Sequence, residues 1–564
     1  MDKSVSETDP RATHARAIKS THTEVSLYNN LITLYSKSDF RSYPLSLFHQ
    51  IKSPNVVTWT ALICAHTNTP HALHHFISML RYPILPNQRT LASLLKTCAS
   101  LLCLSFGLQL HSLSLKLFLS PQPFVGSSLT NFYAKLRLPN EAIKVFDEMP
   151  HSDEVCYSAL VVGLAQNRRS IDALSVFSEM RVRGIGSTLY SISGALSAAA
   201  DVAALEQCRM LHAHAFVSGF ESNVIVNSAL VDGYGKCGLV IDARQVFDEF
   251  VMGMNLVGWN AMLSCYAQQG DKNSALELFD RMVGRGFVPD EYSFLAIVTS
   301  LANSGLVVEI KEWFKKMSVE YGLEPKMEHY TCLIGAMGHA GRLEEAERVA
   351  LTMPFAPDTA VWRALLSACA LHGEPDMAWK MGKRLLELDP KDDSAYVIAA
   401  NVFAGKGRWD EVAEVRSMMK ERRVRKEGGR SWVEVRGMIH VFFAGDRSHE
   451  RREEIYAELS KLMKKIEELG YVPIWNEVLH EAEERRKKEA LWRHSEKLAL
   501  AFALICGAAP PGKAIRIVKN LKICKDCHEA FRYISRVVER EIIVRDMNRY
   551  HTFANGGCSC GGHW

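Results

Sequence analysis

Apolar side chains between residues 256 and 290 follow helical spacing in two successive stretches. The first stretch carries the stripe Trp259, Met262, Leu263 and Tyr266. The second, within 274–283, carries the stripe Ala275, Leu276, Phe279 and Met282. Glycine and polar residues at 269–271 interrupt the pattern, and Gly286 and Pro289 end it. Apolar positions three and four residues apart mark one face of a helix, so this segment predicts a helical hairpin.

The same pattern returns along the chain at a fixed distance. The sequence VFDEM at 145–149 returns as VFDEF at 246–250, an offset of 101 residues, and each block holds units of 31, 35 and 35 residues. One hairpin cannot bury its apolar stripe alone, so neighbouring units must stack into a solenoid with a concave face formed by the first helices. Faces of this kind bind extended partners.

These units resemble pentatricopeptide repeats of the plant PLS class. VFDEM at 145–149 is similar to the class's short motif, and GFVPD at 286–290 to the end of its full-length motif. The alternative, a tetratricopeptide array, keeps a uniform period of about 34 residues, unlike the alternation of 31 and 35. Residues 1–24 form a tail whose end resembles part of another repeat, as expected if the N-terminus is truncated. Residues 25–358 hold ten repeats, at 25–55, 56–87, 88–122, 123–153, 154–188, 189–223, 224–255, 256–290, 291–326 and 327–358.

The sequence after residue 358 departs from the repeats in three steps. Residues 359–426 contain two degenerate hairpins that resemble the E1 and E2 units of the same family. Residues 427–469 resemble the E+ segment, and their alternating apolar positions at 431–435 and 439–442 predict two paired strands. Residues 470–564 resemble the DYW domain. The expected fold is mainly α: a right-handed α-solenoid of helical-hairpin repeats followed by a C-terminal α/β zinc-dependent cytidine-deaminase-like domain.

Length and charge restrict the class of protein but do not identify a binding partner. A chain of 564 residues exceeds the size of a single hydrophobic core. Its 67 basic and 63 acidic residues give a net charge of +4, which permits nucleic-acid binding but does not require it. Residues 97–115 carry no formal charge over the length of a membrane span. The corresponding stretch one period later is charged at Asp201, Glu206 and Arg209, so we expect a buried helix pair and no membrane association.

The 14 cysteines fall into two groups. Ten lie singly in apolar stretches, where a free thiol behaves as a small core residue: Cys64, Cys98, Cys103, Cys156, Cys208, Cys237, Cys265, Cys332, Cys369 and Cys506. The other four lie beside histidines near the end of the chain: Cys524, Cys527, Cys558 and Cys560. This crowding indicates a metal site in a reducing compartment rather than a disulfide framework.

One H-x-E and one C-x-x-C motif together predict a catalytic zinc site. His494, Cys524 and Cys527 supply three ligands and leave the fourth position open for a water molecule, whose pKa the Zn²⁺ ion lowers. Glu496 lies two residues after the histidine and supplies the carboxylate that moves protons. This is the signature of zinc nucleobase deaminases, except that Ile523 stands where those enzymes have proline before the first cysteine.

The remaining ligand-type residues predict a second metal site. Four nitrogen and sulfur ligands without an accompanying acid are typical of a closed structural zinc site: His528, His551, Cys558 and Cys560. The resemblance to the DYW domain also implies this second zinc ion. The family's terminal Asp-Tyr-Trp, however, is replaced here by Gly562, His563 and Trp564, which puts efficiency or target preference in question.

Three alternatives compete for the C-terminal cysteines. The sequence CKDCH at 524–528 has the form of a c-type haem attachment motif, and Cys524 with Cys527 has the form of a thioredoxin-like dithiol. Neither alternative assigns a function to His494 and Glu496. A purely structural zinc domain accounts for every cysteine and histidine and makes Glu496 accidental, because a lone glutamate on a helix usually faces solvent.

The family resemblance also implies which residues contact RNA. Repeat proteins of this kind read one base per repeat with two or three side chains, here the fifth and last residues of each repeat. The pairs are Asn29/Asn55, Thr60/Asn87, Ser127/Asp153, Ser158/Thr188, Ser228/Asn255, Asn260/Asp290 and Thr331/Asp358. By resemblance they favour, in that order, a pyrimidine, A, G, no defined base, A, U and G.

The resemblance therefore implies C-to-U editing of an organellar transcript by zinc-dependent hydrolytic deamination of cytidine, with single-stranded RNA and other editing-complex proteins as partners. An alternative is an RNA-binding specificity factor whose inactive deaminase-like domain recruits a deaminase in trans, and a more distant one is a protein-binding scaffold. Asp2, Glu7, Asp9 and Glu24 fit neither a secretory signal nor an acid-poor presequence. The resemblance nonetheless implies residence in the mitochondrion or, alternatively, the plastid.

Overall fold

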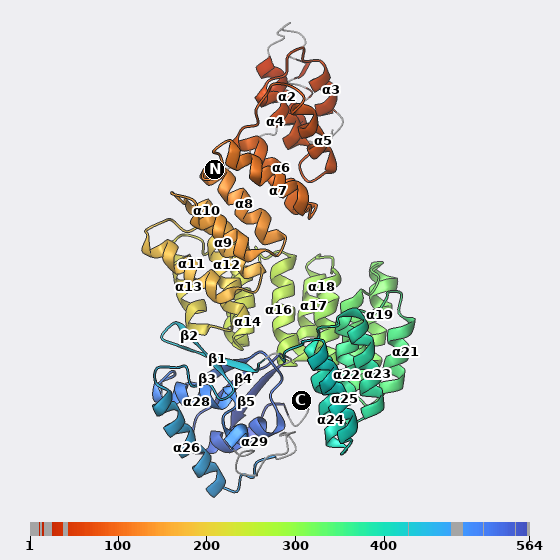
Figure 1. The fold of residues 1–564 in the computed structure, drawn as a ribbon, viewed down its shortest axis with the longest axis vertical. Coiled ribbons are helices and arrows are strands. Elements are labelled where there is room, and N and C mark those ends of the chain that lie inside the picture. The colour runs from red at the N-terminus through yellow and green to blue at the C-terminus, as the bar shows by residue number, and fades with distance from the viewer. Residues whose placement is uncertain are drawn as a thin grey trace. The chain divides into compact units, whose positions relative to one another are not determined.

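The computed structural model describes residues 11, 14, 15, 25–37, 43–426, 428–474, 489–510, 512–547 and 549–560. Most of the tail expected at 1–24 and the terminal Gly562, His563 and Trp564 lie outside the described residues. The chain divides into two compact units, Met1–Ala199 and Ala200–Trp564. Figure 1 shows the helices and strands of both units.

Helix pairs joined by short turns make up the first unit (Figure 1). Its first helices begin where the sequence units begin, since α4 starts at Val56 and α6 at Gln88. The residue before each of these helices caps it: Asn55 accepts a hydrogen bond from the backbone N–H of Thr58, and Asn87 from that of Thr90. The helices are α2 (Val25–Ser36), α3 (Tyr43–His49), α4 (Val56–Ala65), α5 (Pro70–Met79), α6 (Gln88–Ser100), α7 (Leu104–Lys116), α8 (Pro123–Lys135), α9 (Pro139–Asp147), α10 (Glu154–Gln166), α11 (Ser170–Val182) and α12 (Leu189–Asp201).

The second unit continues with helices of the same kind. One hairpin shows why they form: Asn255 caps the start of α16, and Gly270 ends that helix with a left-handed φ of 74°. Trp259 of α16 is fully buried and lies edge-on to Phe247 of α15, with ring centroids 4.8 Å apart. The helices are α13 (Leu205–Val217), α14 (Val224–Lys236), α15 (Val240–Glu249), α16 (Leu256–Gln269), α17 (Lys272–Gly284), α18 (Glu291–Asn303), α19 (Val307–Tyr321), α20 (Met327–His339), α21 (Leu343–Thr352), α22 (Thr359–His372), α23 (Pro375–Leu388), α24 (Asp393–Gly405) and α25 (Trp409–Glu421).

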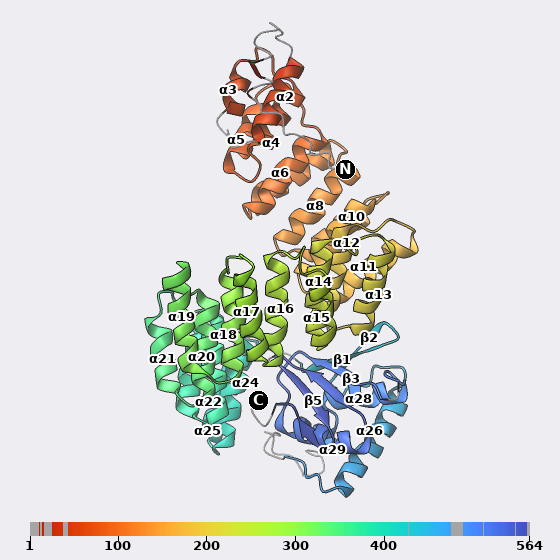
Figure 2. The ribbon, with the colours of Figure 1, turned by 180° about the vertical axis from the view of Figure 1, so that it is seen from behind.

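The C-terminal part of the second unit is built on a mixed β-sheet (Figure 2). Its strand order within the described residues is β2-β1-β3-β4-β5-β6. β3 and β4 are parallel and are joined through helix α29 (Lys525–Val537), whereas the other neighbours are antiparallel. The strands are β1 (Arg430–Val435), β2 (Met438–Phe443), β3 (Ile515–Lys519), β4 (Ile542–Arg545), β5 (Tyr550–Ala554) and β6 (Gly557–Cys558). The strand pair predicted at 431–435 and 439–442 is therefore present as β1 and β2.

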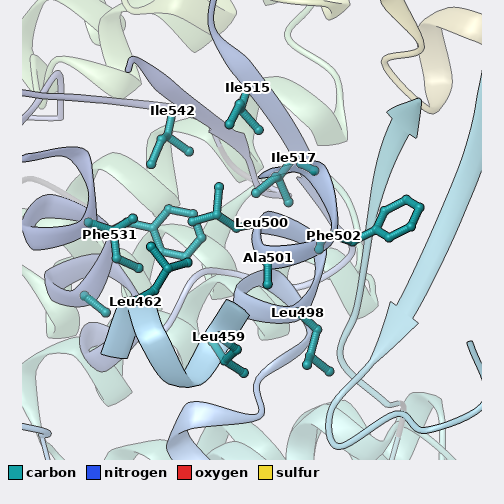
Figure 3. Packing of buried hydrophobic residues seen from close by; sticks show 14 of the residues in the cluster. Leu459, Leu462, Leu498, Leu500, Ala501, Phe502, Ile515, Ile517, Phe531 and Ile542 are labelled. Carbon is teal, nitrogen blue, oxygen red and sulfur yellow. The ribbon is translucent and has the colours of Figure 1, made fainter. Parts of the chain in front are cut away.

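A single hydrophobic core lies under this sheet (Figure 3). Helix α28 (Ser495–Ile505) packs on the sheet, and α26 (Arg452–Glu468) packs against α28 and α29. Strand β1 contributes Val433 and α26 contributes Leu459, while Leu500 and Phe531 come from α28 and α29. Residues on both sides of position 470 thus share one sheet and one core.

The hairpin of β1 and β2 also contacts a repeat helix within the second unit. Ala204, the residue before α13, makes no capping bond with its side chain. Instead, the carboxylate of Glu434 on β1 accepts hydrogen bonds from the backbone N–H groups of Glu206 and Gln207, at 2.7 and 2.9 Å. Gln207 Nε2 in turn donates to the carbonyl oxygen of Gly437, at 2.6 Å. Strand β1 therefore supplies the cap that α13 lacks in its own sequence.

The structure bears on the uncharged stretch 97–115 and on the burial of the scattered cysteines. No helix among the described residues is long and apolar enough to cross a membrane, and the uncharged stretch 97–115 forms parts of α6 and α7. Most of the scattered cysteines are buried, as expected, but Cys64 is exposed and its Sγ lies 3.0 Å from Ser93 Oγ. The expectation of a core position for Cys64 was wrong, because its side chain is exposed to solvent beside Ser93 of α6.

Candidate metal centres

The first group of ligand-type side chains lies at the starts of two helices. His494 is the N-cap residue of α28, and Glu496 lies in the first turn of that helix. Cys524 is the N-cap residue of α29, and Cys527 lies in its first turn. Because α29 follows β3, the cysteines lie beyond the carboxyl end of a parallel strand, where open α/β sheets place their ligands.

The distances within this group fit a tetrahedral zinc ion. His494 Nδ1 lies 3.5 Å from Cys524 Sγ and 3.3 Å from Cys527 Sγ. Zinc bonds of about 2.3 Å to sulfur and about 2.0 Å to nitrogen place tetrahedral ligand atoms about 3.5 Å apart. One carboxylate oxygen of Glu496 completes a set whose atoms all lie within 4.8 Å of one another. The three ligands predicted from the sequence and the predicted carboxylate therefore converge.

Glu496 is fully buried and held at both oxygens. Lys519 Nζ donates to Oε1 at 2.5 Å, and the Ser495 hydroxyl donates to Oε2 at 3.1 Å. Burial by itself raises the pKa of Glu496, but the charges of Lys519 and His494 outweigh that effect and hold the pKa well below its usual value. The carboxylate is therefore ionised, as a group that accepts a proton must be.

The two thiols titrate as a pair. A hydrogen bond from Cys527, helped by His494, holds the pKa of Cys524 well below the usual value of a thiol. Burial and the neighbouring charge of Cys524 raise the pKa of Cys527. One thiolate thus forms first, and a bound metal ion ionises the second, because a coordinating thiol loses its proton.

A buried ion pair joins the two helices that carry these ligands. Lys497 Nζ lies 2.6 Å from Asp526 Oδ2, and both side chains are fully buried. The Tyr471 hydroxyl donates to Asp526 Oδ1 at 2.5 Å, and the backbone N–H of Ile474 donates to the same oxygen at 3.0 Å. Lys497 follows Glu496, and Asp526 lies between the two cysteines, so the pair fixes α28 relative to α29.

The second predicted ligand set also converges. His528 Nε2 lies 3.3 Å from Cys560 Sγ, and His551 Nδ1 lies 3.8 Å from Cys558 Sγ. These four ligand atoms lie within 4.8 Å of one another, and the set includes no carboxylate. A full set of four nitrogen and sulfur ligands suits a closed structural zinc site.

The surroundings of the second set favour metal binding. His551 Nε2 faces Asp546 Oδ2 at 3.3 Å, which leaves Nδ1 for a metal ion, as in carboxylate–histidine–zinc triads. Burial and the neighbouring His551 lower the pKa of His528 to about 4, so its ring is neutral at pH 7 and can act as a ligand. His528 directly follows Cys527, so the first turn of α29 carries ligands of both sets.

This convergence bears on the alternatives for the cysteines. A haem attachment motif or a redox dithiol uses only residues 524–528 and does not account for a histidine ring placed 3.3 Å from Cys527. The purely structural alternative treats Glu496 as accidental, whereas Glu496 is fully buried and one of its oxygens lies among the ligand atoms. The donor set therefore fits a catalytic site of the one-histidine, two-cysteine type better than a structural one.

The last residues of the seven predicted base-contacting pairs share one structural role. They are the N-cap residues of the next helix, and their side chains accept hydrogen bonds from its first backbone N–H groups: Asn55, Asn87, Asp153, Thr188, Asn255, Asp290 and Asp358. Capping accounts for Asn, Asp and Thr at these positions without any RNA contact. It also explains why the sequence pattern locates the helix starts so well.

Some of the predicted base-contacting pairs meet in the structure. Asn260 Nδ2 donates to Asp290 Oδ1 at 2.9 Å, and Ser158 Oγ lies 2.7 Å from Thr188 Oγ1. For the other pairs, the fifth residue lies in the first helix of its repeat and bonds elsewhere or has no bond to its predicted partner. These fifth residues are Asn29, Thr60, Ser127, Ser228 and Thr331.

Sequence patterns missed several residues that touch the predicted site. Lys519 and Ser495 contact Glu496, Ser431 contacts Ser495, and Asp546 orients His551. The available signal for Lys519 was a charged residue at the end of the apolar strand 515–519. Asp546 carried no comparable signal, because its contact with His551 depends on the turn between β4 and β5.

Family models match most of the chain. The DYW family of nucleic acid deaminases matches residues 470–564, the E motif 372–434 and the E+ motif 439–466. The PPR repeat family matches 254–319, and single PPR repeats match 127–153, 155–185, 228–252 and 328–353.

Known proteins of Arabidopsis thaliana are similar over nearly the whole chain. "Pentatricopeptide repeat-containing protein At4g33170" is 36% identical over 98% of this chain, which spans only 56% of that protein. "Pentatricopeptide repeat-containing protein At2g03880, mitochondrial" is 37% identical over 95% of this chain and 85% of its own length. "Pentatricopeptide repeat-containing protein At1g11290, chloroplastic" is 36% identical over 96% of this chain and 67% of its own length.

A solved structure supports the same fold. The crystal structure of the pentatricopeptide repeat protein PPR10 in complex with an 18-nt psaJ RNA element aligns with a TM-score of 0.54. The alignment is 20% identical and covers 73% of this chain and 62% of that one. The helical-hairpin fold expected from the sequence is thereby confirmed. Together with the relatives and the family models, it shows that this chain belongs to the pentatricopeptide repeat proteins that carry E, E+ and DYW segments.

Proposed function

We propose that this protein binds single-stranded RNA and converts a chosen cytidine to uridine by hydrolytic deamination. The observation that carries the proposal is the convergence of His494, Cys524 and Cys527 beside the buried carboxylate of Glu496. Membership of the DYW family of nucleic acid deaminases supports the reaction class. The RNA-bound PPR10 structure supports the use of the repeats as an RNA-binding surface by analogy of fold.

The site contains the groups that deamination needs. A zinc ion held by His494, Cys524 and Cys527 would make a water molecule a better nucleophile at neutral pH. Glu496 would take one proton from that water and pass it to ring N3 of the base, and would then carry the second proton, from the hydroxyl added at C4, to the leaving amine. Because the site is buried, its charged groups act with little screening by solvent. The second set, His528, His551, Cys558 and Cys560, would hold a zinc ion in a structural role.

The repeats would choose the site of reaction. Asn260 and Asp290 are the strongest candidate pair, because their amide and carboxylate lie side by side and form a hydrogen bond at 2.9 Å. An amide beside a carboxylate offers both donors and acceptors to a base. We assign this pair to uridine, and the other pairs to the bases that the family resemblance implies.

The proposed compartment is an organelle. One relative is named mitochondrial and another chloroplastic. A mitochondrial position is proposed first, with the plastid as the alternative. A fluorescent fusion of the full natural reading frame is expected to accumulate in one of these organelles. Stable residence in the cytosol alone would contradict this assignment.

A complementation experiment distinguishes an active deaminase from a specificity factor that recruits a deaminase in trans. Organellar transcripts are sequenced in cells that lack the protein and in the same cells given the wild type or Glu496→Ala. An edited site lost in the first cells and restored by the wild type identifies the target. If Glu496→Ala fails to restore that site although it still binds the RNA, the chain itself supplies the chemistry. Full restoration by Glu496→Ala assigns the chemistry to another protein recruited in trans.

A further inference from the structure

Lys519 is a buried lysine that neither zinc set uses. It ends strand β3, is 8% exposed, and has its Nζ 2.5 Å from Glu496 Oε1. An ammonium group carries three donors and no acceptor, so it cannot ligate a metal ion in this charged form. Its low exposure also keeps it from serving as an ordinary contact to an RNA phosphate. Its described partner is the carboxylate of Glu496.

The two oxygens of Glu496 have unequal partners. Oε1 faces the charged donor Lys519 at 2.5 Å, whereas Oε2 accepts from the neutral hydroxyl of Ser495 at 3.1 Å. The Ser495 hydroxyl also lies 2.9 Å from Ser431 Oγ, so it can turn from Oε2 towards another acceptor. A charge-assisted hydrogen bond is about twice as strong as a neutral one. Oε2 is therefore the carboxylate oxygen of Glu496 that can exchange its hydrogen-bond partner.

The local architecture holds this arrangement in place. Ser431 on β1 lies directly opposite Lys519 on β3 in the sheet register, and both are buried. Ser495 and Glu496 open helix α28, which packs on the same strands. Strands β1 and β3 and helix α28 thus hold the two carboxylate oxygens of Glu496. Ser431 belongs to the segment before residue 470, so that segment reaches the carboxylate through Ser495.

Stability alone is a weak reason for such an ion pair. Removing two charges from water costs several kcal/mol per ion, and replacing a buried pair by well-packed apolar residues is often neutral or stabilising. A free glutamate side chain would occupy several rotamers, and a displacement of about 1 Å can cost about 10²-fold in rate. Orientation of Glu496 is the benefit that this geometry offers.

We propose that Lys519 is a positioning residue that binds Oε1 of Glu496 and thereby reserves Oε2 for proton transfer. This inference rests on the proposed deaminase function and adds a role for a side chain outside the ligand sets. In the proposed reaction Oε2 accepts a proton from water and passes it to the base, and Lys519 keeps its own protons throughout. Its contribution is to hold the carboxylate in one orientation.

The test compares the full-length, zinc-loaded wild type with Lys519→Met and Lys519→Arg on the RNA identified by the complementation experiment. Lys513→Met, an exposed lysine in the turn before the same strand, is the matched control. We expect Lys519→Met to lower kcat about 10²-fold with unchanged KM, RNA affinity and zinc content. Lys519→Arg should recover most of the rate, because arginine keeps a charged donor at Oε1. Lys513→Met should match the wild type.

Two further measurements separate positioning from a structural role. Crystal structures should show the Glu496 carboxylate in one orientation with lysine or arginine at 519 and in several with methionine. Methylammonium ions should restore part of the activity of Lys519→Ala. Wild-type rates for Lys519→Met would overturn the inference, and so would loss of zinc or of folding in both the Met and Ala variants. An inactive wild type would instead refute the proposed function.

Discussion

Glu496 illustrates how one residue acquires its chemistry from its neighbours. It lies two positions after His494, in the first turn of a helix. An exposed glutamate at this position would only interact favourably with the helix dipole. Here it is fully buried, and Lys519 keeps it ionised. The H-x-E spacing predicted the identity of this residue, but the sequence contained no information on its burial or its partner.

Replacing Glu496 by alanine tests its role in a purified system. Positioned acid–base groups contribute about 10²- to 10⁴-fold in rate, so Glu496→Ala should nearly abolish editing while zinc content and RNA affinity persist. Cys524→Ser is the contrasting variant, because loss of a ligand should remove both the catalytic zinc ion and the activity. Normal editing by Glu496→Ala without any other deaminase would show that Glu496 does not carry the protons.

Asn260 is the residue on which the predicted base preference can be tested. Asn260→Thr with Asp290 retained should move the preference of the eighth repeat from uridine towards guanosine. Good direct base contacts discriminate by about 1 to 3 kcal/mol, so the change should exceed fivefold in a competition binding assay. Asn273→Thr makes the same exchange on the exposed side of α17 and should change nothing. An unchanged preference in Asn260→Thr would remove this pair from the code.

At the scale of elements, the N-caps explain both the success and the limit of sequence analysis. Helices α4, α6, α10, α16, α18 and α22 begin directly after an Asn or Asp that caps them. Capping is local, so the sequence predicts these starts well. The position of Lys519 beside Glu496 depends on the packing of α28 on β3, and that of Ser431 opposite Lys519 depends on the pairing of β1 with β3 across more than 80 residues. Pairing at that range leaves no local signal in the chain.

Capping and base contact can be separated by two substitutions. Asp290→Asn should keep the cap of α18, because Asn and Asp cap about equally well, and should change the base preference. Asp392 caps α24 but belongs to no predicted base-contacting pair, so Asp392→Ala should lose about 1 kcal/mol of local stability and leave the preference intact. Hydrogen exchange of the first amides of each helix reports the stability, and competition binding reports the preference. Stability losses in both variants, or in neither, would contradict this division of roles.

At the scale of the second unit, Glu434 makes the contact between β1 and α13 sensitive to pH. Burial, opposed by the hydrogen bonds from Glu206 and Gln207, raises the pKa of Glu434 to about 7. The docked state therefore binds a proton that the undocked state releases near the ordinary pKa of 4.5. The contact is strongest below pH 4.5 and weakens as the pH rises through 7, by on the order of 3 kcal/mol in total.

This pH dependence is open to direct measurement. Hydrogen exchange at the first amides of α13 should be slower at pH 5.5 than at pH 8, after correction for the intrinsic exchange rate. Glu434→Gln keeps an acceptor for these amides but cannot titrate, so its protection should be independent of pH. Equal protection of the wild type at both pH values would show that Glu434 titrates normally in the docked state.

The caps also limit how such a chain can be retargeted to a new RNA. A last position that caps the following helix must offer a short side chain with an oxygen acceptor, as Asn55, Asn87, Asp153, Asn255, Asp290 and Asp358 do. Few residue types besides Asn, Asp, Ser and Thr meet that requirement. Folding therefore restricts the residue types at these positions. The range of bases that a redesigned or naturally varied repeat can prefer is restricted with them.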